Sequence, residues 1–380
     1  MKINSFTIFV NRECNLDCTY CFVDKIEMNL IWSDKIAELV TQVIEQTDEI
    51  VISVLWWEPL LNFAFIQQLI LHVEKMRWEY PTKNIEIGTI NTNGTIYTKD
   101  MYKFFHDHAI ELQFSIDSFL YNTYDHYRVH KTIKDYKLYE IIGNNIEKYK
   151  AIYWVAPRVS IVVTKENVVY LSDLVKYFVE EIWTKSIAIC QLIAKKGFIN
   201  RKAADIFKLE YIKIFNYYIQ NLLRYRVQID PIEEIIEKYL AESFSKEHLS
   251  NCSLWKGLYL WSNGLLYMCT LLAGQWSTQE DHIFWSIEDG LYLTKMEKFS
   301  HQIITRFESK KKENFWDEIN IEKMFCLREW YDVNEAKFNE KLYEDSIHIP
   351  FLLIESLSKH LNKYIIAYFE TKYDFVSRFR

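Results

Sequence analysis

The sequence has no apolar run of the roughly 20 residues needed to span a bilayer. Its first residues include a short apolar run but no signal-peptide core and no small-residue cleavage site. The net charge of −7 and the pI near 5.9 give no general reason to expect a nucleic-acid or anionic-membrane partner. We therefore expect a cytoplasmic protein that binds neither nucleic acid nor membrane.

Glycine is scarce, whereas tryptophan is abundant. The 380 residues contain 8 glycines and 12 tryptophans, and average usage would give about 27 glycines. The chain shows no internal repeat and no low-complexity linker. With 49% hydrophobic residues it is long enough for one large domain and a smaller one.

Short apolar runs alternate with helical patterns through the first half of the chain. The runs are rich in Ile and Val without strict alternation, which is typical of strands covered on both faces. The expected strands are 6–10, 50–55, 85–90, 112–116, 159–163 and 187–192, and the expected helices are 33–45, 63–77, 99–106, 136–149 and 168–180. Ser33 and Asn62 are candidate N-caps of the first two helices. Six β-then-α units predict an α/β fold, either an open doubly wound sheet or a partial barrel.

The alternation of expected strands and helices changes after about residue 200. Helical patterns at 203–223 and 232–244 follow each other, and we expect no strand between them. Asn263-Gly264 then marks the turn of a hairpin.

Three of the seven cysteines follow the first expected strand. Cys14, Cys18 and Cys21 are spaced C-x3-C-x2-C. Three thiolates this close together suit three corners of one compact cluster, and a [4Fe–4S] cluster so held keeps one iron open. A zinc site would need a fourth ligand from elsewhere, and free thiols are the other alternative. We expect Cys190, which stands in an apolar run, to be an inert core residue.

This spacing resembles the signature of the radical S-adenosylmethionine (SAM) enzymes, and the resemblance covers most of the chain. The family has an aromatic residue before the third cysteine, which packs near the adenine of SAM, and Tyr20 stands there. The family also has Gly-Gly-Glu-Pro after the second strand, whose backbone binds the SAM ammonium group. This chain reads Trp56-Trp57-Glu58-Pro59 at that point.

Four further matches follow at the family's spacing. Thr92-Asn93-Gly94, Ser115-Ile116-Asp117, Arg128 and Thr164-Lys165-Glu166-Asn167 each resemble a family motif. Each motif except Arg128 ends an expected strand, where α/β barrels build their sites. Any one match would fit an ordinary loop, but six at consistent spacing favour the family. The resemblance implies that SAM is bound by Tyr20, Trp56, Trp57, Glu58, Asn93, Ser115 and Arg128.

The resemblance also implies the chemistry. The open iron of a [4Fe–4S] cluster would chelate SAM, and one electron would cleave it to a 5′-deoxyadenosyl radical. That radical would abstract hydrogen from a substrate, while the protein positions the groups and excludes water. A flavodoxin- or ferredoxin-type protein would donate the electron. The family fold would be a partial (β/α)6 TIM-type barrel.

Cys252 and Cys269 resemble the opening of the SPASM/twitch extension of this family, with Gly264 between them. Only Cys326 follows, so the ligand count excludes two full auxiliary clusters. One auxiliary [4Fe–4S] cluster on Cys252, Cys269 and Cys326 would take its fourth ligand from another residue such as His248 or from the substrate. The alternative is a domain that kept this fold and lost its cluster.

We therefore expect three parts: a radical SAM core at 1–230, a smaller α+β twitch/SPASM-like cluster domain at 231–345, and a helical extension at 346–380. Relatives with such an extension mostly modify peptides or proteins, which favours a peptide or protein substrate. The alternatives are a small metabolite as substrate, or a non-catalytic or degenerate cluster-binding interaction protein. Thr270 replaces an Asp that serves as a base in sulfatase-maturing relatives, which argues against that activity.

Several tryptophans stand where glycine is expected. Two indoles at Trp56 and Trp57 would obstruct a backbone that must approach a ligand closely. Four more stand at expected helix ends, in turns or after a cysteine: Trp78, Trp183, Trp255 and Trp285. GGA and UGA differ by one base, and some bacterial codes read UGA as glycine while others read it as tryptophan. Our hypothesis is that UGA codons of this gene encode glycine; the alternatives are an inactive homologue or a tolerated variant site.

Overall fold

The structure is a computed structural model that describes residues 3–21, 28–55, 57–118, 128–133, 137–164, 166–191, 201–230, 232 and 257–267, with 285–286, 290–291, 295, 298, 331–332 and 337–338. The chain divides into two compact units. Unit 1 comprises Met1–Ser115, Asp125–Pro157 and Cys252–Ile319, and unit 2 comprises Ile116–Tyr124, Arg158–Asn251 and Asn320–Arg380.

A seven-stranded sheet organises unit 1. In spatial order its strands are β12 (Gly290–Leu291), β11 (Trp285–Ser286), β10 (Leu266–Tyr267), β9 (Gly257–Leu260), β1 (Ser5–Ile8), β2 (Glu49–Val54) and β3 (Asn84–Ile87). β1 pairs in parallel with β2 on one side and β9 on the other, whereas β9 to β12 pair antiparallel. The hairpin after residue 257 therefore continues the sheet from β1.

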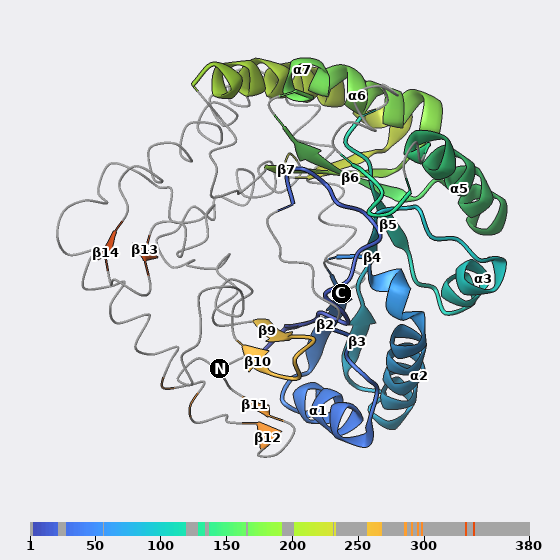
Figure 1. The fold of residues 1–380 in the computed structure, drawn as a ribbon, viewed down its shortest axis with the longest axis vertical. Coiled ribbons are helices and arrows are strands. Elements are labelled where there is room, and N and C mark those ends of the chain that lie inside the picture. The colour runs from blue at the N-terminus through green and yellow to red at the C-terminus, as the bar shows by residue number, and fades with distance from the viewer. Residues whose placement is uncertain are drawn as a thin grey trace. The chain divides into compact units, whose positions relative to one another are not determined.

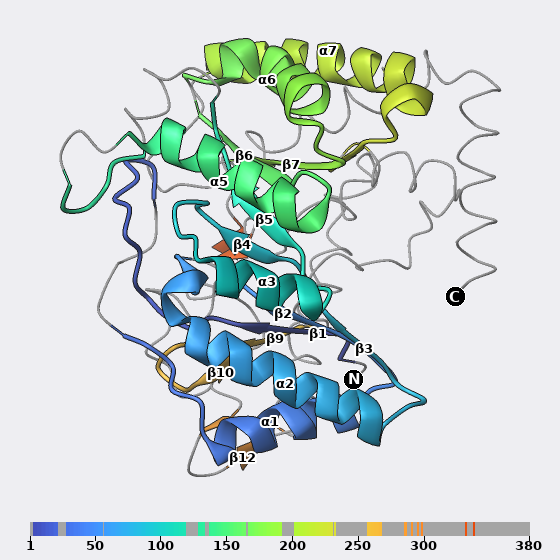
Figure 2. The same ribbon diagram turned by 90° about the vertical axis from the view of Figure 1, so that its right-hand side faces the viewer.

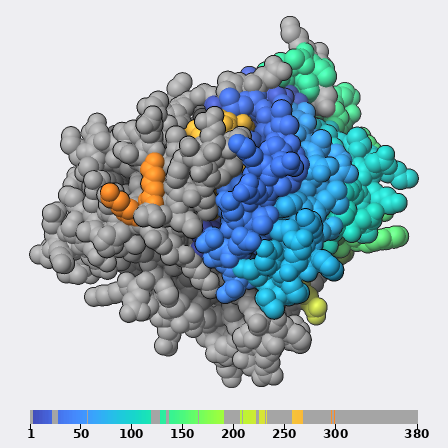
Figure 3. All heavy atoms as spheres, turned by 90° about the horizontal axis from the view of Figure 1, so that it is seen from below, coloured from blue at the N-terminus to red at the C-terminus, as the bar shows by residue number. Residues whose placement is uncertain are grey.

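Two helices cover one face of this sheet. α1 (Asp34–Glu45) and α2 (Phe63–Glu79) lie together on the same side of β1, β2 and β3 (Figures 1 and 2). Each carries a row of buried aliphatic side chains, which form the core of unit 1 with the strands. Their outer faces form the continuous blue surface in Figure 3.

The N-terminal ends of α1 and α2 are capped differently. Ser33 caps α1 as expected, because its hydroxyl accepts a hydrogen bond from the Ile36 N–H. Asn62 stands at the N-cap position of α2 but does not cap it with its side chain. Its amide instead donates to the carbonyls of Val10 (2.8 Å) and Leu30 (2.9 Å), which ties the chain beyond β1 to the start of α2.

The rest of unit 1 follows the same alternation. β4 (Ile90–Thr92) and β5 (Leu112–Ser115) pair in parallel, α3 (Lys99–Asp107) connects them, and α5 (Leu138–Tyr153) packs against α3. The single expected strand 85–90 is thus two strands, β3 and β4, interrupted at Gly88 and Thr89.

Unit 2 holds a parallel sheet of β6 (Arg158–Val163), β7 (Ser186–Gln191) and β8 (Gln228–Asp230). Its helical segments are η2 (Val168–Tyr170), α6 (Leu171–Tyr177), η3 (Phe178–Ile182) and α7 (Arg201–Tyr225), and α6 and α7 lie side by side (Figures 1 and 2). Our expectation of no strand between the 203–223 and 232–244 helices is wrong. β8 was overlooked because it is only three residues long, although it buries Ile229.

The α/β fold with parallel sheets is confirmed, whereas closure into a partial barrel stays a prediction. The hairpin turn is confirmed, since Gly264 has φ +78° and its N–H donates to the Trp261 carbonyl at 2.8 Å. A further two-stranded sheet pairs β13 (Tyr331–Asp332) with β14 (Lys337–Phe338). No helix of the described part is long and apolar enough to cross a membrane.

Several sequence predictions lie outside the described residues. These are most of the 232–244 helix and all of the 346–380 extension, together with His248, Cys252, Trp255, Cys269 and Cys326. The domain boundaries at 230 and 345 stay predictions. Two tryptophans do not stand where we expected glycine to be favoured. Trp78 lies within α2, which runs two residues further than expected, and Trp285 lies in strand β11.

One tryptophan ends a helix in an unfavourable conformation. Trp154 follows α5 with φ 62° and ψ 7°, its N–H donates to the Lys150 carbonyl at 2.8 Å, and the residue is 87% exposed. This left-handed conformation costs a side-chain-bearing residue about 1 kcal/mol and favours glycine. The exposed indole offers little burial to offset that cost.

We therefore expect Trp154→Gly to raise the free energy of unfolding by about 1 kcal/mol. The matched control is Trp78→Gly, which changes an equally exposed tryptophan (84%) inside α2 and should lower it by about 0.5 kcal/mol. Urea denaturation of both variants measures the two shifts. Equal destabilisation by both substitutions would contradict the prediction.

Candidate functional site

The three cysteines of the C-x3-C-x2-C motif lie on one loop after β1. Cys14, Cys18 and Cys21 are all half-buried. The Cys21 N–H donates to the Cys18 carbonyl at 3.0 Å, and the Leu16 N–H donates to the Cys14 Sγ at 3.4 Å. The buried side chain of Leu16 anchors the loop between the first two cysteines.

A second segment runs antiparallel to this cysteine loop. The Asp17 N–H donates to the Val129 carbonyl at 2.6 Å, and the Lys131 N–H donates to the Asn15 carbonyl at 3.0 Å. This pairing fixes the neighbouring Arg128, whose guanidinium lies 5.8 Å from the centre of the Tyr20 ring. The tertiary fold thus brings together two predicted site residues that are 108 positions apart in the sequence.

Asn93 joins the cysteine loop to the end of β4. Its Nδ2 donates to the Asn15 Oδ1 at 2.8 Å and lies 3.8 Å from the Cys14 Sγ. Its Oδ1 accepts hydrogen bonds from the N–H and hydroxyl of Thr95. The Asn15 Nδ2 completes this network by donating to the Thr95 Oγ1 at 2.8 Å.

Glu58 is the most completely buried charged residue of the site, at 0% exposure. Its Oε1 accepts hydrogen bonds from the Thr92 hydroxyl (2.8 Å) and the Leu60 N–H (3.2 Å), and its Oε2 accepts one from the Asn93 N–H (2.7 Å). Its own N–H donates to the Glu13 carbonyl at 3.0 Å. Glu58 therefore connects the end of β2, the end of β4 and the cysteine loop.

Burial raises the pKa of Glu58 from its ordinary 4.5 to about 7. The hydrogen bonds from Asn93, Thr92 and Leu60 and the charge of Arg128 lower the pKa, but the loss of hydration outweighs them. Both carboxylate oxygens accept hydrogen bonds within the chain, so the side chain serves as an internal connector. Direct contact of Glu58 with a cofactor stays a prediction.

Gly94 keeps the turn after β4 tight. Its φ is +76°, and a Cβ at this position would stand 2.8 Å from the ring of Phe114. Its carbonyl accepts a hydrogen bond from the Asn145 Nδ2 of α5 at 2.9 Å. The positive φ and the lack of room for a Cβ both require glycine in the Thr92-Asn93-Gly94 motif.

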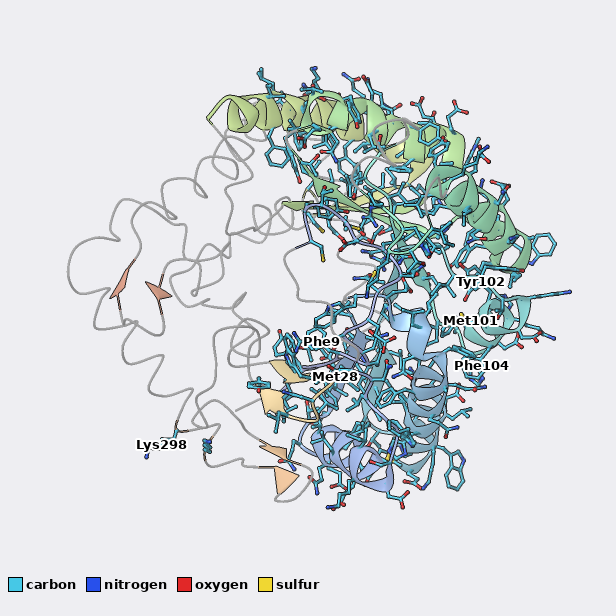
Figure 4. The ribbon with its side chains drawn as sticks, in the orientation of Figure 1. Phe9, Met28, Met101, Tyr102, Phe104 and Lys298 are labelled. Carbon is cyan, nitrogen blue, oxygen red and sulfur yellow. The ribbon has the colours of Figure 1, made fainter. Side chains whose placement is uncertain are left out.

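An aromatic cluster stands beside the Trp57 end of β2. Phe9 follows β1, its N–H donates to the Leu260 carbonyl, and it lies against the β9–β10 hairpin (Figure 4). The Trp57 ring lies 6.1 Å from the Phe9 ring and 5.6 Å from the Trp261 ring, both edge-on. The guanidinium of Arg12 lies 5.8 Å from the Trp57 ring. The indole thus fills the space between Phe9, Trp261 and Arg12.

The donor set of the cysteine loop suits an iron–sulfur cluster better than a single metal ion. A single zinc ion needs its sulfur ligands about 2.3 Å from one point. In the described part of the chain, no three Cys, His, Asp or Glu side chains converge in that way. A cluster binds each thiolate at a different iron atom, so its ligands can lie further apart on a loop such as this one.

The structure brings most of the predicted site residues into unit 1. Ser115 lies half-buried at the end of β5, whereas Trp56 lies outside the described residues. Asn167 belongs to unit 2, where its amide donates to the Asp117 carbonyl at 2.9 Å. Cys190 is exposed, so its expected core position is wrong, because it stands near the end of β7.

The sequence reading missed the polar residues that hold the motifs in place. They are Asn11, whose amide donates to the Glu58 carbonyl at 2.8 Å, and Asn15, Thr95 and Asn145. Two asparagines flank the first cysteine in N-R-E-C-N, and this was the signal that could have pointed to Asn11 and Asn15.

The raised pKa of Glu58 predicts a dependence of stability on pH. The folded state binds this proton more tightly than the unfolded state, so the stabilisation is fully present below pH 4.5 and is lost as the pH rises to about 7. The loss should amount to about 3 kcal/mol. Glu58→Gln, which does not titrate, should remove this component.

The measurement is the free energy of unfolding of both proteins at several pH values from 5 to 8. The difference between wild type and Glu58→Gln should shift in favour of the variant as the pH rises, and other titrating groups cancel in that difference. Two parallel curves would show that Glu58 does not titrate in this range.

The chain is similar to proteins of one family. Residues 8–177 match the Radical SAM superfamily. The uncharacterized protein MJ0907 of Methanocaldococcus jannaschii is 27% identical over 268 residues, which is 70% of this chain and 84% of that protein.

Solved structures share the fold. Native anSMEcpe with bound AdoMet superposes with a TM-score of 0.69 at 19% identity, over 93% of this chain and 99% of that one. Streptococcus suis SuiB bound to precursor peptide SuiA superposes with a TM-score of 0.56 at 15% identity, over 80% of this chain and 66% of that one. The family match begins at the last residue of β1 and spans the cysteine loop and the strand ends around Glu58 and Asn93. The part of this chain that holds the cysteine loop and these strand ends is therefore similar to the radical SAM superfamily.

Proposed function

We propose that this chain is a radical SAM enzyme that holds a [4Fe–4S] cluster on Cys14, Cys18 and Cys21 and uses it to cleave SAM. The observation that carries the proposal is the cysteine loop itself. Its three half-buried thiols stand on a loop fixed by Asn93 on one side and by the 128–131 segment on the other. When bound, the cluster and SAM supply a 5′-deoxyadenosyl radical for hydrogen abstraction.

The residues of the chain orient this site. Asn93 holds the loop and aims its Nδ2 at the sulfur of Cys14, which would stabilise a thiolate. Arg128 and Tyr20 form a cation–π pair beside the cysteines, so an aromatic and a cationic group face the same region. Together with Ser115, these residues are our candidates for holding SAM. Glu58 fixes the Asn93 backbone and so acts through it.

Anaerobic reconstitution with iron and sulfide tests the cluster. We expect about four iron per chain at this site, and Cys18→Ala should lose them because the remaining two thiolates leave the cluster without a full set of ligands. Iron analysis and the visible absorption of the cluster are the measurements. Cys190→Ala is the matched control, since that exposed thiol lies in unit 2 and should not change the iron content.

Zinc bound in place of iron would contradict the proposal. It would favour the other candidate, a metal-binding interaction protein without catalysis. Iron loss in the Cys190→Ala control would show that the assay reports folding rather than ligation.

We further propose a twitch/SPASM-like domain at 231–345 with an auxiliary cluster on Cys252, Cys269 and Cys326. It is supported by the cysteine spacing, which resembles the opening of that extension. A reconstituted chain would then hold more iron than its Cys252→Ala variant. A flavodoxin- or ferredoxin-type protein is the proposed electron donor.

A peptide is the proposed substrate, and a small metabolite is the alternative. Two proteins of the same fold support the peptide: anSMEcpe was solved with the Cp18Cys peptide and SuiB with the precursor peptide SuiA. We expect a short gene for a precursor peptide beside the gene of this chain. A neighbourhood of small-molecule biosynthetic genes instead would favour the metabolite.

A further inference from the structure

Positive φ angles in this protein fall on tryptophan far more often than side-chain sterics would allow. Among the described residues, five that are not glycine have φ above +45°: Trp57, Ala109, Trp154, Trp183 and Arg226. Asn, Asp and His are enriched among the non-glycine residues in this conformation, and a bulky residue there is an outlier. Three tryptophans among five is therefore not explained by the ordinary preferences of the backbone.

Two of these tryptophans end helices in the manner of glycine. Trp154 ends α5 and Trp183 ends η3, with φ of 62° and 67° and ψ of 7° and 29°. After the second, the Thr184 N–H donates to the Phe178 carbonyl at 3.0 Å, which closes the helix end. A left-handed residue with such closing bonds is the position at which helices most often place glycine.

The indoles at these two helix ends gain little from their positions. Trp154 is 87% exposed and Trp183 is 59% exposed. A large apolar side chain is stabilising when it is buried, and here most of each ring faces solvent. At both positions the backbone conformation is unfavourable for tryptophan and the side chain gains little burial, whereas glycine would adopt this conformation without the cost.

Trp57 shows the same backbone at the candidate site. Its φ is 47°, and it directly precedes Glu58, whose backbone hydrogen bond to Glu13 fixes the turn. Unlike the other two, its ring has neighbours in Phe9, Trp261 and Arg12. With glycine at position 57, the space that the indole fills beside Phe9, Trp261 and Arg12 would be open to a ligand.

We propose that positions 57, 154 and 183 are glycine in the protein made by its own cell, because the UGA codons of this gene are read there as glycine. The backbone angles carry this proposal without any reference to the enzyme's activity. Trp78 and Trp285 are not part of it, since their helix and strand positions do not call for glycine. Trp32 is expected to be a true tryptophan, because its ring packs on Phe65 at 5.3 Å.

The codons and the native protein provide the decisive test. We expect UGA at 57, 154 and 183, and UGG at 32. In the protein purified from the source cells, the tryptic peptides 151–158 and 177–185 each contain one of these positions, and mass spectrometry should find glycine in both. UGG at 154 and 183, or tryptophan in both peptides, would overturn the proposal.

A second test concerns the site and rests on the proposed function. The chain with tryptophan at position 57 should bind SAM weakly, and Trp57→Gly should tighten binding by about tenfold or more without changing the iron content. Trp154→Gly is the control, because it changes a helix end and should leave the SAM affinity unchanged. Unchanged SAM binding in the Trp57→Gly variant would overturn the proposal that glycine at position 57 opens the site to SAM.

The outcomes of the two tests are independent of each other. If iron is bound and SAM is not bound by either form, the proposed function fails while the codon result still decides the residue identities. If SAM binds both forms equally and the codons are UGG, the recoding fails and the enzyme proposal stands.

Discussion

The buried carboxylate of Glu58 is the interaction on which the site depends. Three donors from two segments meet on its two oxygens, and its backbone bonds to Glu13 just before the first cysteine. Removing a carboxyl group from water is costly, and these hydrogen bonds compensate part of that cost. The hydrogen bonds of Glu58 fix the ends of β2 and β4 and the cysteine loop relative to one another.

The remaining parts of the site follow from that arrangement. Once the end of β4 is held, Asn93 reaches Asn15 and Cys14, and Gly94 turns the chain against Phe114. Parallel strands bring their carboxyl ends to one edge of a sheet, so residues that follow different strands become neighbours there. The site is therefore a property of the strand ends, and the helices outside them stabilise the sheet that presents these ends.

The tryptophans at Trp57, Trp154 and Trp183 are places where local preference and tertiary fold disagree. Natural sequences usually agree with their fold at every level, so disagreement of one kind at three separate positions indicates one common cause. A loss of function would be expected to damage the site, but two of these residues, Trp154 and Trp183, stand at exposed helix ends. A change in how codons are read affects all positions alike, whether or not they take part in catalysis.

By itself, the sequence determined the alternation of strands and helices, the C-x3-C-x2-C loop, the cap at Ser33 and the turn at Asn263-Gly264, because each depends on short-range spacing or a local hydrogen bond. It did not determine that Arg128 stacks on Tyr20, that Asn62 ties Val10 to Leu30, or that β9 joins the sheet at β1. Those contacts join segments tens to hundreds of residues apart, and no local preference encodes them. Nor could composition separate Trp154 and Trp183 from Trp78 and Trp285, because only the folded backbone fixes the sign of φ at each position.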